Sequence, residues 1–279
     1  YGIFIMSGGS IRDNTADYGG GVNLTNGTFT MSGGAIRDNT ADYGGGLHLQ
    51  SFSASEMSGG LISNNITRSL GGGVNMSGTN TFTLSGGAIR DNEITTSSVS
   101  GGGVQISGSI NFSMTGGAIT GNHIDTNGGY GAGVAMGGTV AFSMSGGAIS
   151  GNSLAGINYL RGGGVNISGG TFTMSGNAVI SGNHVNGNYY AAAGGGGVYV
   201  DGAGTFIMEG GIVYGNEVAD TELRNTTVSV GAALHKATTA TGDVKWGAAG
   251  GKIGGTPDST PPDIDLDSGT HQDLTLSAP

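Results

Sequence analysis

The sequence predicts an all-β chain that winds into a single-stranded parallel β-helix (a solenoid) of about eight to nine coils. The first observation is a recurring phrase: "TFTMSGGAIRDN" at 28–39 returns as "TFTLSGGAIRDN" at 81–92, with looser copies elsewhere. The second is its period, because the Met or Leu before the glycine pair recurs every 25 to 34 residues. The third is the pattern inside each copy, where apolar residues stand two apart in short segments, which is typical of strands and not of helices.

Each coil contains three predicted strands, which read F-x-M, A-I-x-x-N and G-G-G-V-x-L, with turns of Gly, Ser, Asn and Asp between them. Since side chains alternate along a strand, Phe29 and Met31 point to the same side and stack on their equivalents in the next coil. Four inward rows are therefore expected to form a long, thin core. The rows are Phe4, Phe29, Phe82, Phe112, Phe142, Phe172 and Phe206; Met6, Met31, Met57, Leu84, Met114, Met144, Met174 and Met208; Ile11, Ile36, Ile62, Ile89, Ile119, Ile149, Ile180 and Val213; and Val22, Leu47, Val74, Val104, Val134, Val165 and Val198.

One asparagine falls at the same turn of every coil. Stacked asparagines can satisfy the backbone groups of a bend and hydrogen-bond to the amide groups of the next coil. We therefore expect a structural ladder and not a row of binding residues. Its predicted members are Asn14, Asn39, Asn65, Asn92, Asn122, Asn152, Asn183 and Asn216.

The repeats define one region, 1–236, and the segment 237–279 is expected to hold a degenerate last coil, a cap and a tail rich in Pro and Asp. Within it, 242–253 reads as a degenerate strand and turn, with Val244 and Trp246 in the Phe and Met places. Because the chain begins inside a repeat and without Met, we expect it to be part of a longer polypeptide.

Composition excludes several classes of function. The chain of 279 residues has 62 glycines, 10% charged residues and a net charge of −10. Its few basic residues are scattered, so no basic patch is expected for nucleic acid. It has no cysteine, which excludes disulfides and thiolate chemistry, and no long apolar run, so direct membrane insertion is not expected.

A family resemblance enters at the GGAI segments, at 33–36, 86–89, 116–119 and 146–149, each followed by x-x-N. This pattern resembles the repeats of chlamydial polymorphic outer-membrane proteins and is similar to adhesin-like β-helix proteins of gut and oral bacteria. The resemblance covers about residues 4–235. It implies a right-handed β-helix in a bacterial cell-surface or secreted protein, with an adhesive or structural role, no enzymatic activity, and glycans or proteins of a host or neighbouring cell as partners.

The segment between the Asn and the Gly run lengthens along the chain, from "TADY" at 15–18 to "HVNGNYYAAA" at 184–193. We expect it to be a loop, and insertions in solenoids collect on one face that often binds a partner. Six of the nine tyrosines lie in it, and the sequence favours packing over the glycine-rich edge while leaving ligand binding open. The ligand-binding candidates are Tyr130, Tyr159, Tyr189, Tyr190, Asp125 and Asn158.

Three alternatives stay open at this point. A polysaccharide lyase or glycoside hydrolase would use this fold, but it needs a singular pair or cluster of carboxylates, whereas Asp13, Asp38 and Asp91 belong to the copied phrase. No catalytic or cofactor-binding residue is therefore predicted. A weak Ca²⁺ site is conceivable where Asp17 and Asp42 stand near Asp13 and Asp38. An ice-binding surface is the most remote alternative, because the outward Thr-x-Thr row is interrupted.

Overall fold

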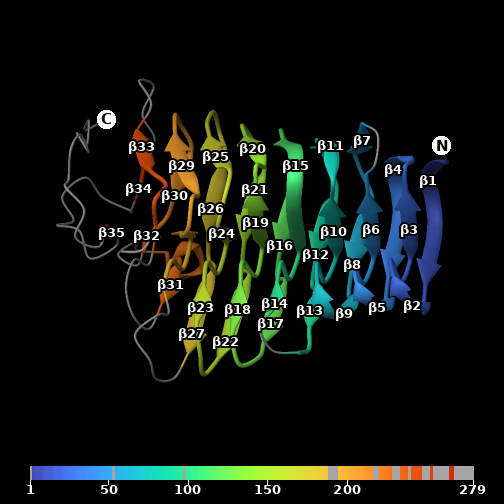
Figure 1. Ribbon diagram of the computed structural model, residues 1–279, viewed down its shortest axis with the longest axis horizontal. Helices are drawn as coiled ribbons and strands as arrows, with labels where there is room; N and C mark the ends of the chain where they lie inside the picture. Colours follow the sequence, from blue (N-terminus) through green and yellow to red (C-terminus); the bar gives the residue numbers. More distant parts are fainter. Residues whose placement is uncertain are drawn as a thin grey trace.

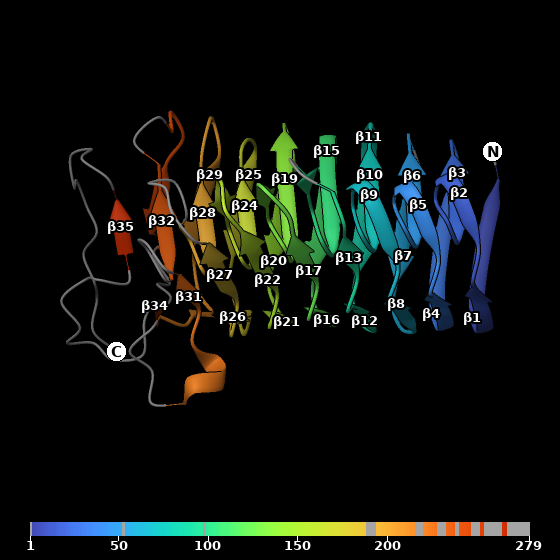
Figure 2. The ribbon, with the colours of Figure 1, turned by 90° about the horizontal axis from the view of Figure 1, so that it is seen from below.

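The protein is a parallel β-solenoid whose coils stack along one axis from the N-terminal end (Figures 1 and 2). The computed structural model describes residues 2–51, 54–96, 99–187, 194–215, 220–227, 233–237, 240–246, 252–253 and 264–266. Equivalent residues of successive coils pair in register: Phe4 lies opposite Phe29, and Met6 opposite Met31. The stack has about seven turns, so the expected eight to nine coils were slightly too many, because beyond Met208 only short strand pieces join the described stack.

The F-x-M and A-I segments form one continuous face of the solenoid. Two of these strands, β1 and β4, run through both segments, whereas later coils divide them into two strands. The strands of this face are β1 (Ile3–Arg12), β4 (Thr28–Arg37), β7 (Ser55–Met57), β8 (Leu61–Ser63), β11 (Thr79–Leu84), β12 (Ala88–Arg90), the second half of β15 (Val104–Met114), β16 (Ala118–Thr120), β20 (Ala141–Met144), β21 (Ala148–Ser150), β25 (Thr171–Met174), β26 (Val179–Ser181), β29 (Thr205–Met208), β30 (Ile212–Val213), β33 (Val244–Trp246) and β34 (Lys252–Ile253).

The V-x-L segments form the opposite wall of the same lobe. Their strands are β3 (Val22–Thr25), β6 (Leu47–Gln50), β10 (Val74–Ser77), the first half of β15, β19 (Val134–Gly138), β24 (Val165–Ile167), β28 (Val198–Val200), β32 (Leu234–Lys236) and β35 (Ile264–Leu266). The register extends past the regular repeats, since Val244 pairs with Phe206 and Trp246 with Met208, which are the places that the sequence indicated for them.

The four predicted apolar rows fill the space between these two walls. From Phe29 to Phe206 the Phe row is fully buried, with ring centroids of neighbouring coils as close as 4.4 Å between Phe142 and Phe172. The third coil breaks the row with Ser55, which stays buried because its hydroxyl accepts a hydrogen bond of 3.0 Å from the backbone N–H of Phe29. Burying a large apolar side chain contributes about 1.5–3 kcal/mol, so these rows stabilise every coil.

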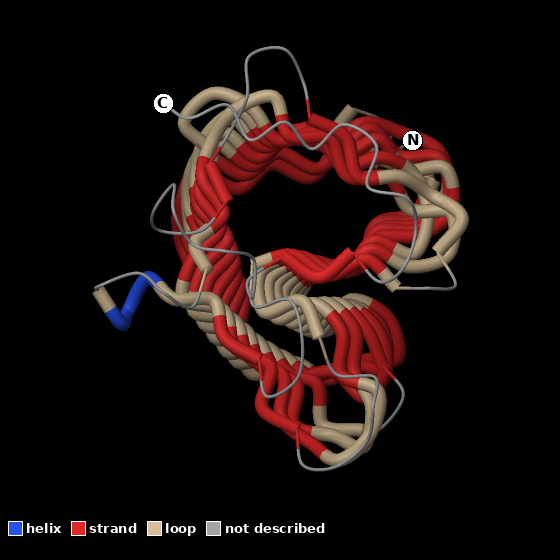
Figure 3. Tube along the Cα trace, turned by 90° about the vertical axis from the view of Figure 1, so that its left-hand side faces the viewer, coloured by secondary structure: helices blue, strands red, loops and turns tan. Residues whose placement is uncertain are grey.

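The segment expected to be a loop is instead a second, smaller lobe built of strands. Figure 3, which looks along the solenoid, shows a larger lobe and a smaller one that meet at a narrow waist. The small lobe has its own apolar core, formed by Ile94, Val99, Ile124, Ala132, Leu154, Leu160 and Val185. Its strands are β2 (Thr15–Tyr18), β5 (Thr40–Tyr43), β9 (Ile66–Leu70), β13 (Glu93–Ile94), β14 (Val99–Ser100), β17 (His123–Asp125), β18 (Gly129–Tyr130), β22 (Ser153–Gly156), β23 (Leu160–Arg161), β27 (His184–Gly187) and β31 (Thr226–Thr227). The only helix among the described residues is the 3-10 turn Thr221–Leu223.

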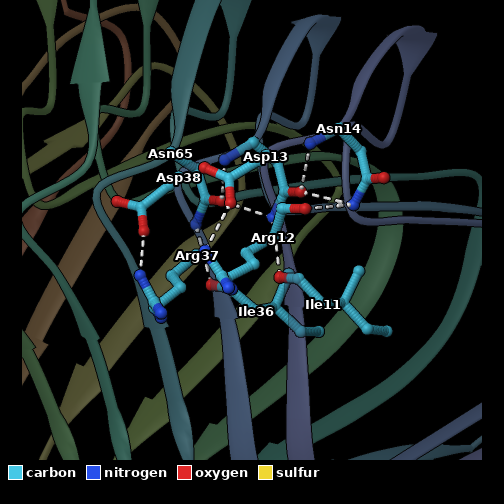
Figure 4. Close-up of polar contacts among 9 residues, drawn as sticks. Ile11, Arg12, Asp13, Asn14, Ile36, Arg37, Asp38 and Asn65 are labelled. Carbon is cyan, nitrogen blue, oxygen red and sulfur yellow. Dashed lines mark hydrogen bonds and ion pairs between the residues drawn. The ribbon is translucent and has the colours of Figure 1, made fainter.

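An asparagine ladder runs along the waist, as the sequence predicted. From Asn39 onward the side-chain amide of one asparagine donates to Oδ1 of the next at 2.9–3.0 Å, and to the carbonyl of an isoleucine one coil back at 3.0–3.1 Å (Figure 4). The last rung differs from the prediction: Asn183 donates to Asn225, and the predicted Asn216 lies outside the described residues. The long insertion in this coil places the equivalent asparagine 42 residues after Asn183.

The glycine triplet that precedes each V-x-L strand closes the waist from the other side. Its first glycine has a positive φ, as in Gly101 at 73°. Its third glycine faces the ladder: a Cβ at Gly103 would lie 2.7 Å from Nδ2 of Asn122 in the next coil. The two lobes therefore meet where a residue without a side chain touches a buried amide, and this contact explains why the triplet is copied along the chain.

Candidate functional site

The middle residue of each V-x-L strand points away from the large-lobe core, toward the small lobe. These residues, which we call the polar row, pair in register from coil to coil: Asn23, His48, Asn75, Gln105, Ala135, Asn166, Tyr199 and His235. From His48 onward each is at most 8% exposed. These residues face outward from the large lobe and are still buried, so the small lobe covers them. The covering strands are those that lead back toward the glycine triplet, such as β14, β18 and β23, and we call them the returning strands.

Side chains of the small lobe contact the polar row directly. Tyr18 packs against His48 with ring centroids 5.2 Å apart, and the Ser100 hydroxyl donates a hydrogen bond of 2.6 Å to Oε1 of Gln105. Further along, the guanidinium of Arg161 lies 5.3 Å from the ring centroid of Tyr199. The polar row and the small lobe thus form one interface that follows the axis of the solenoid.

This interface contains a cavity of about 260 Å³ where the polar row reaches Ala135. Ala135 stands between Gln105 on the preceding coil and Asn166 on the following one. A methyl group replaces an amide side chain there, and the space that the side chain would fill stays open. The cavity is lined by residues that include Gln105, Tyr130, Ala135, Arg161, Asn166 and Asp201.

Arg161 connects the charged and aromatic groups around this cavity. It forms an ion pair with Asp201, and both side chains are largely buried, at 23% and 20% exposed. Its guanidinium carbon also lies 5.7 Å from the ring centroid of Tyr130 and 5.8 Å from that of Tyr159. Such cation–π contacts contribute about 0.5–2 kcal/mol each. They hold three aromatic rings around one cation.

Two polar atoms of the cavity lining lack a hydrogen-bond partner among the described residues. One is the buried Nε of Arg161, a donor, and the other is the buried Oδ1 of Asn166, an acceptor. An unpaired buried polar atom costs about 1–3 kcal/mol, which makes such atoms uncommon in stable interiors. Each of the two atoms exposes less than 1 Å², so both lie behind the surface of the cavity and not on it.

Tyr159 lies against the guanidinium of Arg161, a residue of the cavity lining. Its side chain is 59% exposed, and its backbone has φ 33°, a left-handed conformation that a bulky residue rarely adopts. Strained backbone of this kind costs about 1–3 kcal/mol and collects at ligand-binding positions. The structure therefore holds an exposed aromatic ring against Arg161 in spite of a conformational penalty.

The structure brings together two of the predicted ligand-binding residues, Tyr130 and Tyr159, both against Arg161. Asn158 is exposed beside Tyr159, whereas Asp125 is exposed on β17, the outgoing strand of the small lobe. Tyr189 and Tyr190 lie outside the described residues.

Sequence reasoning missed most of the lining, including Ala135, Arg161 and Asn166, and it missed Tyr199, which lies against Arg161. Three of these residues, Ala135, Asn166 and Tyr199, stand in the polar row, which is the variable x of V-x-L in the sequence. Alignment of the coils on that position would have identified them.

Three of the four acidic residues considered for Ca²⁺ are engaged with arginines. Asp13 pairs with Arg12, Asp38 with Arg37, and Asp42 with Arg68 at 3.3 Å (Figure 4 for the first two). Asp17 is exposed on β2. Across the described ranges no three His, Asp or Glu side chains come together as a metal site would require. The backbone explains the first two, because Asp13 and Asp38 occupy a turn position with φ 61° and 56° that Asp tolerates.

Two histidines in these coils have perturbed protonation. Desolvation by burial lowers the pKa of His48, whose Nδ1 lies 3.1 Å from Nδ2 of Asn75. Burial also lowers the pKa of His184, whose Nδ1 lies 2.7 Å from the Thr226 hydroxyl. Both rings are thereby favoured in the neutral form.

In the described part of the chain, no helix has the length and apolar character needed to cross a membrane. Comparison of the chain with protein-family models, with curated proteins and with solved structures finds no match.

Proposed function

We propose that the chain is a non-enzymatic binding module of a cell-surface or secreted protein, and that it binds carbohydrate at the Ala135 cavity. The observation that carries the proposal is the convergence of Tyr130, Tyr159 and Tyr199 on Arg161 beside a cavity lined with amide and hydroxyl groups. Sugar rings present C–H faces that pack on aromatic rings and hydroxyls that hydrogen-bond to amide and guanidinium groups. The surface or secreted location rests on the resemblance of the GGAI repeats to bacterial adhesin-like proteins.

The shape of the site favours a carbohydrate over a protein ligand. A stable protein interface covers about 800 Å² on each partner and has apolar anchors at its centre. The cavity of about 260 Å³ is instead concave and small, and it is lined with polar groups. The exposed large apolar side chains of the described chain are dispersed, with Ile3 and Ile5 at the first strand and Ile157 two residues before Tyr159.

The carboxylates of the site support a binding function over hydrolysis. Glycoside hydrolases use a pair of carboxyl groups on either side of the scissile bond. Among the described residues that line the cavity, Asp201 is the one carboxylate, and it is paired with Arg161.

The test is a glycan array with the whole chain, followed by calorimetry on the glycans that bind. Tyr159→Ala is expected to weaken binding at least tenfold while the melting temperature changes little, because this ring is 59% exposed. Tyr18→Ala is the matched control, since Tyr18 is also an exposed tyrosine of the small lobe, at 49%, but lies in the first coil. Equal binding by wild type and Tyr159→Ala would overturn the proposed site. Release of sugar products during incubation would overturn the non-enzymatic assignment in favour of a lyase or hydrolase.

A further inference from the structure

The cavity exists because the polar row has a gap. On either side of Ala135 the row carries an amide residue, Gln105 and Asn166, each at most 8% exposed. Ala135 itself is 2% exposed, so its position is as enclosed as theirs. Nearby, Gly137 also lacks a side chain, and a Cβ there would have only the Ser168 hydroxyl within 4 Å. Two missing side chains on one strand, β19, therefore open the space beside Arg161.

The polar side chains of the lining define the chemistry of what fits this space. Gln105 and Asn166 carry amides, and Ser100 and Ser168 carry hydroxyls, so the lining has both donors and acceptors. A carboxylate accepts but does not donate, and an ammonium group donates but does not accept. Hydroxyl groups do both, so a hydroxyl-rich molecule matches this lining.

The charge of the cavity excludes an anionic ligand. The positive charge of Arg161 is already balanced by Asp201, and the chain as a whole has a net charge of −10. An acidic sugar would have to compete with Asp201 for the guanidinium and would meet repulsion from its carboxylate. A neutral sugar meets neither obstacle, and its ring can lie against Tyr159.

We infer that the Ala135 cavity holds a single neutral sugar residue, and that Ala135 is the residue that determines whether the cavity can admit it. The amides of Gln105 and Asn166 hydrogen-bond to hydroxyls of this sugar, and Tyr159 packs on the ring. The inference rests on the proposed carbohydrate-binding function and deepens it, because it names the class of sugar and the residue that makes room for it.

The test is saturation-transfer NMR on the whole chain with four probes: methyl β-glucopyranoside, methyl β-galactopyranoside, methyl α-mannopyranoside and the acidic methyl β-glucuronide. At least one neutral glycoside is expected to bind, with the glucuronide at least tenfold weaker. Ala135→Gln places in the gap the residue type that Gln105 carries one coil earlier. It is expected to abolish binding while the melting temperature stays equal or rises, because it fills a cavity. Ala135→Ser is the matched control and should bind as wild type.

Asn166→Leu provides a second variant, in which the amide is removed and the branched shape of the side chain is kept. It is expected to weaken binding of the neutral glycoside at least tenfold. Tighter binding of the glucuronide, or normal binding by folded Ala135→Gln, would overturn the inference. A chain that binds glycans on the array through Tyr159 but is indifferent to Ala135→Gln would leave the proposed function standing and refute this site alone. A chain that binds neither glycans nor glycosides refutes both.

Discussion

The side-chain amide of Asn122 donates a hydrogen bond of 2.9 Å to Oδ1 of Asn152 on the following coil. The same amide donates to the carbonyl of Ile89 at 3.1 Å, and its own Oδ1 accepts from the backbone and the side chain of Asn92. One fully buried side chain therefore joins three coils. Its removal would leave partners on both sides unsatisfied.

Asn122→Ala is expected to lower the free energy of unfolding by about 3 kcal/mol or more, since each buried group that loses its partner costs about 1–3 kcal/mol. Asn14→Ala is the control, because Asn14 is exposed at the first coil and has a ladder neighbour on one side only. The control should lose less than about 1 kcal/mol. Urea unfolding followed by circular dichroism measures both, and equal losses would show that burial does not set the strength of the ladder.

Gly103→Ala is expected to destabilise the protein by about 1–3 kcal/mol, the range for overpacking a tight contact. The new methyl would lie 2.7 Å from Nδ2 of Asn122 and 2.7 Å from the carbonyl oxygen of Gly133. Gly8→Ala is the control, because a Cβ there meets nothing within 4 Å. Thermal unfolding of the two variants should differ clearly, and a neutral Gly103→Ala would mean that the waist can widen at little cost.

Gly151→Asn is expected to change stability by less than about 0.5 kcal/mol, whereas Gly151→Val should cost about 1–2 kcal/mol. Gly151 has φ 63°, and the equivalent positions in earlier coils carry Asn64 at 52° and Asp91 at 54°. A Cβ at Gly151 has room, since its nearest neighbour is the Thr120 hydroxyl at 3.6 Å. The comparison isolates backbone conformation from packing. Equal melting temperatures for both variants would show that the turn has no conformational requirement.

Stability is expected to fall as the pH decreases from about 7 to about 5, in part through His48 and His184. Burial lowers the pKa of both in the folded chain, so the unfolded chain, with a pKa of about 6.5, takes up protons first. The two histidines contribute their full share of the folding stability above the pKa of the unfolded chain. This share is lost as the pH falls toward the lower pKa of the folded chain. His48→Gln combined with His184→Ser should flatten the melting temperature across this range. Gln105 and Ser153 already occupy the same rows, so the variant should fold. An unchanged slope would assign the pH dependence to other groups.

The large lobe could be predicted from the sequence because a stacked coil meets the same environment at every turn. Phe142 lies on Phe172 and Ile119 on Ile149, and the repeat phrase alone sets this register. The turn that precedes each ladder asparagine could be predicted for the same reason, since its position is occupied by Asp, Asn or Gly, and all three tolerate a positive φ. Where copies are identical, local sequence and fold specify the same structure.

The small lobe could not be predicted because its strands carry little apolar alternation. "TADY" at 40–43 has only Ala41 fully enclosed, and its pairing depends on backbone hydrogen bonds from neighbouring coils. The cavity escaped prediction for a related reason. Arg161 and Asp201 are 40 residues apart in the sequence. The lengths of the coil segments between them must be known before the two side chains can be placed together. The substitution that opens the cavity, Ala135, is an ordinary apolar residue until the row on either side of it is known.

The contact between the third glycine of a coil and the asparagine of the next joins residues from two successive copies of the phrase. Removal of one whole period, such as 115–144, would bring Gly103 against Asn152 in place of Asn122 and leave every partner of the same type. Removal of half a period would set a side chain against the amide and break the ladder. Within a coil, the segment between the asparagine and the glycine triplet varies in length, because it lies in the small lobe and away from this contact. Duplication and deletion of whole repeats are the further changes by which its genes can vary in length without unfolding the product.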